Sequence, residues 1–194
     1  MSETAAADSA RPRGQRPNWF IALPVDASPW FRDRVTTPPA GVRRFHADDL
    51  HLTVAFLGAC GDEAARRAFA RVSEWSLEPL EASVGDLVPM GTPQRYSALA
   101  LLLEQGREPV EREIGRVRDG WLAAADARPD TRAPKAHVTI ARPRRRGLAD
   151  ERRAGLEWAE AIDLHGLPVS LGRPALYTWS PERKERLFEI VERS

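Results

Sequence analysis

Apolar residues follow two different spacings along the chain, and the spacing predicts the secondary structure of each segment. Short runs that are continuously apolar, or that alternate with polar residues, are typical of strands. Strands are predicted at residues 19–23, 50–57, 83–90, 96–103, 136–141, 169–177 and 186–192. Apolar residues that recur every three or four positions, together with helix-start residues, indicate helices. Helices are predicted at residues 28–35, 62–75, 110–125 and 148–162.

The order of these segments predicts the fold class. Helices and strands are interspersed, but they do not alternate strictly as they do in parallel sheets built from βαβ units. We therefore expect an α+β fold with mainly antiparallel sheets. Trp75 and Trp121 fall on the apolar faces of two predicted helices, and we expect both to pack in the core.

One short pattern occurs twice, at positions about half the chain length apart. Residues 51–54 read His-Leu-Thr-Val and residues 137–140 read His-Val-Thr-Ile. Both copies fall in predicted strands, where successive side chains point to opposite faces. Each strand is therefore expected to present a histidine and a threonine on one face and to bury the apolar residues on the other. In the first strand, regular alternation also assigns Phe56 to the buried face.

Two such strands side by side would bring His51, Thr53, His137 and Thr139 to one groove. An unperturbed histidine titrates near pH about 6.5, so one imidazole can accept a proton while the other donates one. Hydroxyl groups can bind the non-bridging oxygens of a phosphate ester. The alternative is that each imidazole is a structural residue satisfied by its neighbouring threonine. Because the pattern is matched in two strands, we favour an acid–base pair acting on a phosphate ester.

The bulk composition limits the range of functions. The chain has 194 residues, so we expect one domain. Its formal net charge of +1 argues against a protein that coats nucleic acid along its length. The first 17 residues are rich in Ala, Ser, Arg and Pro, and we expect them to form a disordered tail rather than a secretory signal. Residues 18–194 are then expected to form one domain of two pseudo-repeated lobes. No run is apolar enough to span a membrane. We expect a cytoplasmic monomer with no membrane or protein partner.

The sequence offers little to hold a metal or a cofactor. Cys60 is the only cysteine, so neither an internal disulfide nor a thiolate metal cluster is expected. The chain has no His-Glu-x-x-His motif for zinc and no phosphate-binding loop of the ATPase type. We therefore expect chemistry that needs neither metal nor cofactor.

These motifs resemble the HxTx signatures of the two-histidine (2H) phosphoesterase superfamily. Within it, the chain is similar to the bacterial RNA 2′,3′-cyclic phosphodiesterases, also called 2′-5′ RNA ligases. Three stretches carry the resemblance: residues 19–24 (Trp-Phe-Ile-Ala-Leu-Pro), residues 50–58 around the first motif, and residues 136–142 around the second. The resemblance implies a bilobal fold of two pseudo-symmetric, mainly antiparallel sheets, with helices on the outer faces and a central active-site groove.

The resemblance also implies a reaction and a role for each residue. The expected activity is metal-independent hydrolysis of a 2′,3′-cyclic phosphate at an RNA 3′ end to a 2′-phosphate, with a slow reverse 2′-5′ ligation. His51 would be the proton donor and His137 the proton acceptor. Thr53 and Thr139 would hold the phosphate.

Several alternatives stay open at this stage. The motifs handle only a phosphate, so a small cyclic nucleotide or a 2′-5′ oligonucleotide is an alternative substrate, and an RNA-end-binding module without turnover is a third interpretation. Arg142 matches a basic residue of the family that would bind the phosphate, but regular alternation places it opposite His137. The basic residues 142–146 either steer RNA phosphates or form a solvated loop. Tyr177 either stacks on a base or packs in the sheet.

Overall fold

The computed structural model describes residues 16–145 and 147–194, so the predicted tail lies, up to residue 15, outside the described residues. The strands are β1 (Trp19–Asp26), β2 (Val42–Arg44), β3 (His51–Gly58), β4 (Leu80–Pro89), β5 (Leu99–Leu103), β6 (His137–Pro143), β7 (Pro168–Leu171), β8 (Ala175–Trp179) and β9 (Phe188–Arg193). The helices are α2 (Phe31–Arg34), α3 (Asp62–Phe69), α4 (Arg107–Ala124) and α5 (Ala149–Glu160), with 3-10 turns η2 (Ala47–Asp49) and η3 (Val72–Glu74).

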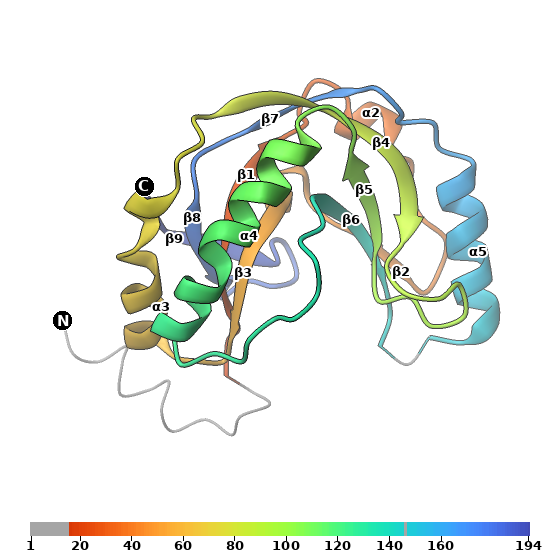
Figure 1. Ribbon diagram of the computed structural model, residues 1–194. Coiled ribbons are helices and arrows are strands. Elements are labelled where there is room, and N and C mark those ends of the chain that lie inside the picture. The colour runs from red at the N-terminus through yellow and green to blue at the C-terminus, as the bar shows by residue number, and fades with distance from the viewer. Residues whose placement is uncertain (1–15, 146) are drawn as a thin grey trace.

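The strands form two four-stranded arrays, each of which makes one lobe. The first lobe has the order β3-β1-β8-β9, and the second has the order β2-β6-β5-β4. Strand β7 pairs with both β1 and β4, so the two arrays are joined into one hydrogen-bonded network rather than two separate sheets (Figure 1). Every pair in the network is antiparallel. This confirms the predicted α+β class.

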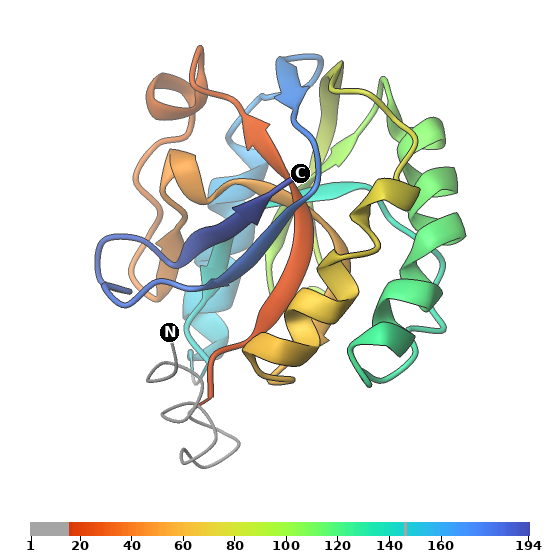
Figure 2. The same ribbon diagram turned by 90° about the vertical axis from the view of Figure 1, so that its left-hand side faces the viewer.

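The helices cover the outer faces of the lobes. Helices α3 and α4 pack on β1, β3 and β8, and Figure 2 shows them side by side on that lobe. Helix α5 packs against β2, β4 and β6 of the second lobe (Figure 1). The ring centroids of Trp75 and Trp121 lie 6.3 Å apart in the buried core, which confirms the packing role expected for them. No helix in the described part of the chain is long and apolar enough to cross a membrane.

Three elements differ most from the prediction. The segment 169–177 is not one strand: it divides into β7 and β8 around Gly172 and Pro174. Strand β7 pairs with β4 and with the end of β1, whereas β8 pairs with β1 and β9. Proline has no N–H for a sheet ladder, which favours a break at that point. The helix predicted at 62–75 ends at Phe69, and a 3-10 turn completes it. Strand β2 was not predicted, because its three residues are too short and too charged to show a period.

An irregularity in β3 changes which side chains face the histidine. The register with β1 skips Val54, so β3 carries one extra residue there, as in a β-bulge. Val54 and Ala55 are consequently both buried, and Phe56 is 55% exposed. Phe56 is paired with Phe20, whose ring contacts that of His51, and residues paired in this way share one face of the sheet. The expectation that Phe56 lies on the buried face was therefore wrong.

Strand β6 has the same irregularity at the equivalent position. Its register with β5 skips Ile140, both Ile140 and Ala141 are buried, and Arg142 is exposed. The bulge reverses the alternation, so Arg142 is not opposite His137 as the regular pattern predicted. In both strands, the fifth residue after the histidine thus returns to the histidine's side.

Candidate active site

His51 is the first residue of β3 and is enclosed by aromatic rings. Its ring centroid lies 4.8 Å from that of Phe20, 5.1 Å from that of Phe188 and 5.5 Å from that of Tyr177. Only 7% of the residue is exposed. Its Nδ1 lies 2.7 Å from the backbone oxygen of Asp49, which can only accept a hydrogen bond, so Nδ1 carries the proton. The imidazole is thereby oriented with Nε2 as the nitrogen left for chemistry.

His137 is held in the same way at the start of β6. Its Nδ1 donates to the backbone oxygen of Lys135 at 2.6 Å, again two residues upstream. The two histidines therefore share one tautomer and one local geometry. A neighbouring threonine satisfies neither of them, so the structural interpretation of the motifs does not describe these contacts.

The two motif threonines are free to bind a ligand. In residues 16–145 and 147–194, neither hydroxyl makes a hydrogen bond. Thr53 is half-buried and Thr139 is buried, each two residues after a histidine. Strands β3 and β6 contact each other, so the structure brings the two predicted motifs together.

Burial and nearby positive charge control the protonation of both imidazoles. Burial lowers the pKa of His51 from 6.5 to about 4; the hydrogen bond to the Asp49 backbone opposes this shift, and the charges of Arg142 and His137 add to it. The pKa of His137 is also lowered, first by burial and then by the positive charges of Lys135 and Arg142. Arg142 therefore acts on both histidines. Near neutral pH, both imidazoles of the ligand-free protein are mostly neutral.

A buried carboxylate, which the sequence did not single out, fixes the wall around His51. Asp49 is 1% exposed and accepts hydrogen bonds from the backbone N–H groups of Leu187 and Phe188 at 2.9 and 3.3 Å. It also accepts one from Nε of Arg186 at 3.1 Å. These bonds hold the start of β9, and with it the Phe188 ring, against His51. No local pattern in the sequence marks this contact, because Asp49 and residues 186–188 lie far apart in the chain.

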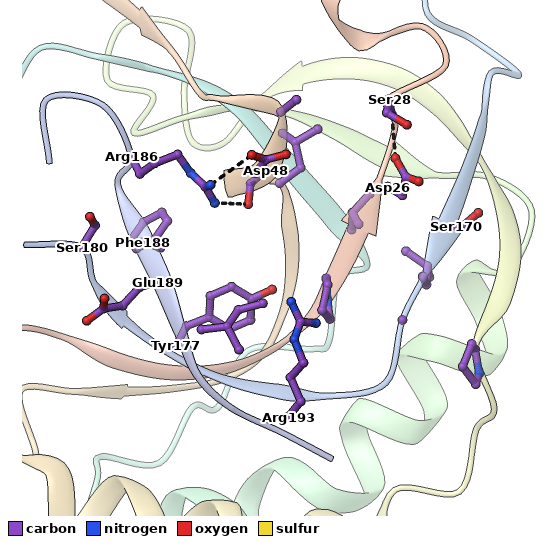
Figure 3. A pocket seen from close by; sticks show the side chains of 18 of the residues that line it. Asp26, Ser28, Asp48, Ser170, Tyr177, Ser180, Arg186, Phe188, Glu189 and Arg193 are labelled. Carbon is purple, nitrogen blue, oxygen red and sulfur yellow. Dashed lines mark hydrogen bonds and ion pairs between the residues drawn. The ribbon is translucent and has the colours of Figure 1, made fainter. Parts of the chain in front are cut away.

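A large cavity lies beside the histidines, not at them. It has a volume of about 980 Å³, and its walls include Tyr177, Phe188, Asp48 and Arg186 (Figure 3). The Asp48–Arg186 ion pair crosses one side of it. Neither histidine lines this cavity. Tyr177 is 3% exposed and stacks on Phe20 at 5.0 Å, which favours packing in the sheet over stacking on a base.

The comparisons with known proteins rest on structure. No family model matches the sequence, and no curated protein matches it. The fold resembles the crystal structure of E. coli LigT complexed with 3′-AMP, with a TM-score of 0.64 at 18% identity over 92% of this chain and 98% of that one. A second match is a crystal structure titled phosphoesterase, with a TM-score of 0.60 at 19% identity over 91% and 96% of the two chains. A third match is the crystal structure of TT0787 of Thermus thermophilus, with a TM-score of 0.61 at 18% identity over 90% of this chain and 95% of that one. The chain therefore shares its fold with E. coli LigT and with the structure titled phosphoesterase.

Proposed function

We propose that the protein hydrolyses the 2′,3′-cyclic phosphate of an RNA 3′ end to a 2′-phosphate, with His51 and His137 as the acid–base pair. The observation that carries this proposal is the matched geometry of the two imidazoles. Each donates Nδ1–H to a backbone carbonyl two residues upstream and keeps Nε2 available, and each stands beside a threonine hydroxyl with no partner among the described residues. This arrangement suits proton transfer on both sides of one phosphorus atom.

The proposed reaction needs one proton taken up and one given. Nε2 of His137 accepts a proton from water while the water oxygen bonds to phosphorus. The bond between phosphorus and the ribose O3′ breaks, and His51 gives its proton to O3′. The products are a 2′-phosphate and a free 3′-hydroxyl, and each histidine ends in the protonation state in which the other began. A proton exchange with solvent then restores the enzyme.

In this proposal, three side chains bind the phosphate. The hydroxyls of Thr53 and Thr139 can donate to the non-bridging oxygens, and the guanidinium of Arg142 supplies positive charge where negative charge builds up. E. coli LigT has been crystallised with 3′-AMP, with phosphate, with ATP and with NADP+, all of which carry phosphate groups. Those complexes support a phosphate or nucleotide as the ligand of this fold.

Phe56 is the proposed platform for the terminal base. It is one of two large hydrophobic side chains that are exposed in the described part of the chain, and the bulge turns it toward the side of His51. An exposed aromatic ring beside a phosphate site can stack on a base of any sequence, which stabilises binding by about 1–3 kcal/mol.

Burial bears on which histidine is the acid. Because the pKa of His51 is about 4, His51 is a strong proton donor but is rarely protonated in the ligand-free protein. A bound phosphate raises the pKa of both imidazoles through its negative charge, so the charged donor forms in the complex. A substrate with a p-nitrophenyl leaving group tests this division, because that group leaves without a proton. The donor variant should recover activity on it and the acceptor variant should not. Recovery by His137→Ala alone would reverse the roles.

The proposed function is tested with RNA that ends in a 2′,3′-cyclic phosphate. We expect His51→Ala and His137→Ala each to lower kcat by at least about 100-fold, as the loss of a general acid or base does. His51→Gln and His137→Gln serve as second variants of closer size, and urea unfolding checks that they fold. A wild-type product with a 2′-phosphate, formed at the same rate with and without EDTA, supports the proposal. A 3′-phosphate product, or a variant that keeps more than about a tenth of the rate, contradicts it.

A further inference from the structure

Four arginines surround a small cavity next to the catalytic histidines. The cavity has a volume of about 190 Å³. Its lining residues are Arg43, Phe45, Arg142, Pro143, Arg144, Arg183, Leu187 and Phe188. They come from β2 and the residue after it, from β6 and the residue after it, and from the segment that leads from β8 into β9, which are distant in sequence. Since Phe188 contacts the His51 ring and Arg142 acts on both imidazoles, the cavity adjoins the proposed reaction site.

Within the described residues, no carboxylate pairs with the arginines of this cluster. Among the described residues, none of Arg43, Arg142, Arg144 and Arg183 forms an ion pair, whereas arginines elsewhere do, such as Arg66 with Asp62. The one side-chain hydrogen-bond donor of the four is Arg43, and it donates to the backbone oxygens of residues 183 and 184. Neutral carbonyls orient that guanidinium but leave its charge in place. Four like charges around one cavity destabilise the ligand-free protein, so an anion bound there would stabilise it.

Two of the guanidiniums are oriented by aromatic rings. The Arg183 guanidinium lies 4.2 Å from the centroid of Trp179, and that of Arg142 lies 5.5 Å from the centroid of Phe45. Neither donates a side-chain hydrogen bond in the part of the chain that the structure describes, so their N–H groups are available to a ligand. The pKa of Arg142 is lowered by loss of solvation and by the charge of Arg183, which shows that the cations repel one another. Stacked guanidiniums with free donors match the oxygens of a phosphate group.

We infer that this arginine cavity binds a second phosphate of the substrate, namely the 5′-phosphate of the nucleotide whose cyclic phosphate lies between the histidines. The inference rests on the proposed function and makes it more specific. In an RNA strand, that phosphate is the phosphodiester linking the last two nucleotides. The protein should therefore prefer a strand end over an isolated nucleoside cyclic phosphate.

Binding of stable analogues, which carry a 3′-phosphate in place of the cyclic phosphate, tests the inference without any turnover. The probes are 3′-AMP with one phosphate, adenosine 3′,5′-bisphosphate with two, and the dinucleotide ApA carrying a 3′-phosphate. In isothermal titration calorimetry, we expect both two-phosphate probes to bind about tenfold more tightly than 3′-AMP. A gain of this size corresponds to one additional charge-assisted hydrogen bond. Arg43→Gln and Arg183→Gln should remove this difference. Arg112→Gln, an exposed arginine of α4 with the same change in charge, should keep it.

The outcomes separate the inference from the proposed function. Equal affinity for all three probes, or a gain with the dinucleotide alone, overturns the phosphate site whether or not the protein is an enzyme. A gain with both two-phosphate probes that disappears in the arginine variants supports the site even if no cyclic phosphate is hydrolysed. In wild type, the slope of log affinity against log salt should be steeper for the bisphosphate than for 3′-AMP, because salt screens the additional contact between charges. An unchanged slope also overturns the inference.

Discussion

The burial of His51 predicts that the stability of the protein depends on pH in a specific way. The folded protein keeps this imidazole neutral down to a pH of about 4, whereas the unfolded chain protonates it below 6.5. Between these values only the unfolded state binds the proton, so acid favours unfolding. The contribution of His51 to stability is complete above pH 6.5 and is lost as the pH falls toward 4.

The size of the stability loss follows from the size of the pKa shift of His51. A shift of one pKa unit corresponds to about 1.4 kcal/mol, so the full shift from 6.5 to about 4 is worth about 3 kcal/mol. At about pH 5 the unfolded chain has gained most of its proton and the folded protein little, so about 2 kcal/mol of stability should already be lost. Burial lowers the pKa of His137 too. This adds to the stability that the protein loses in acid, but it does not change the share of that loss that depends on His51.

Urea unfolding at about pH 7.5 and about pH 5, for wild type and His51→Gln, isolates this contribution. Between about pH 7.5 and about pH 5, the free energy of unfolding should fall by about 2 kcal/mol more in wild type than in the variant, because glutamine does not titrate. Thr53→Val perturbs the same groove without removing a titrating group, and it should keep the wild-type loss. If wild type and His51→Gln lose stability equally, His51 is solvated, and the account of a buried, neutral imidazole is refuted.

Three further predictions concern the site. The pH profile of kcat/KM, which reports the free enzyme, should have its optimum below pH 6.5, because the pKa values of His51 and His137 are both lowered. The optimum of the kcat profile, which reports the enzyme–substrate complex, should lie at higher pH, and coinciding profiles would contradict this. Asp49→Asn should lower the free energy of unfolding in urea by about 2–4 kcal/mol, because it removes the buried charge that Arg186 and two backbone N–H groups contact; a loss below about 1 kcal/mol would contradict it. Phe56→Ala should raise KM at least about fivefold with an unchanged unfolding free energy, and an unchanged KM would rule out stacking.

The sequence predicted the elements that have a clear apolar period. The α+β class, the antiparallel pairing and the two motif strands follow from local patterns, and the structure contains them. The packing of Trp75 and Trp121 was predictable for the same reason, since both fall on the apolar face of an amphipathic segment. Strand β2, in contrast, depends on its pairing with β6, and three residues carry no period of their own.

The parts of the site that could not be predicted depend on contacts between distant segments. Asp49 contacts residues 186–188 across most of the chain, and no local pattern marks that contact. The arginine cavity combines Arg43, Arg142 and Arg183 from three separate segments. The interpretation of residues 142–146 as a basic run therefore captured only two of the cavity's four arginines, and residue 146 lies outside the described residues.

The two bulges explain why a symmetric pair of motifs can bind an asymmetric substrate. Both strands carry their extra residue directly after the His-x-Thr unit, so the repeated structure extends to the fifth residue after each histidine. That position holds Phe56 in the first lobe and Arg142 in the second. The residues that we propose to bind the phosphate are duplicated, while the flanking positions differ in chemistry: an aromatic ring suits a base, and a guanidinium beside three others suits phosphates. In our proposals, the terminal base lies over β3 and the strand leaves past β6. The roles of the two histidines then differ because the ends of the substrate differ, although their local geometry is the same.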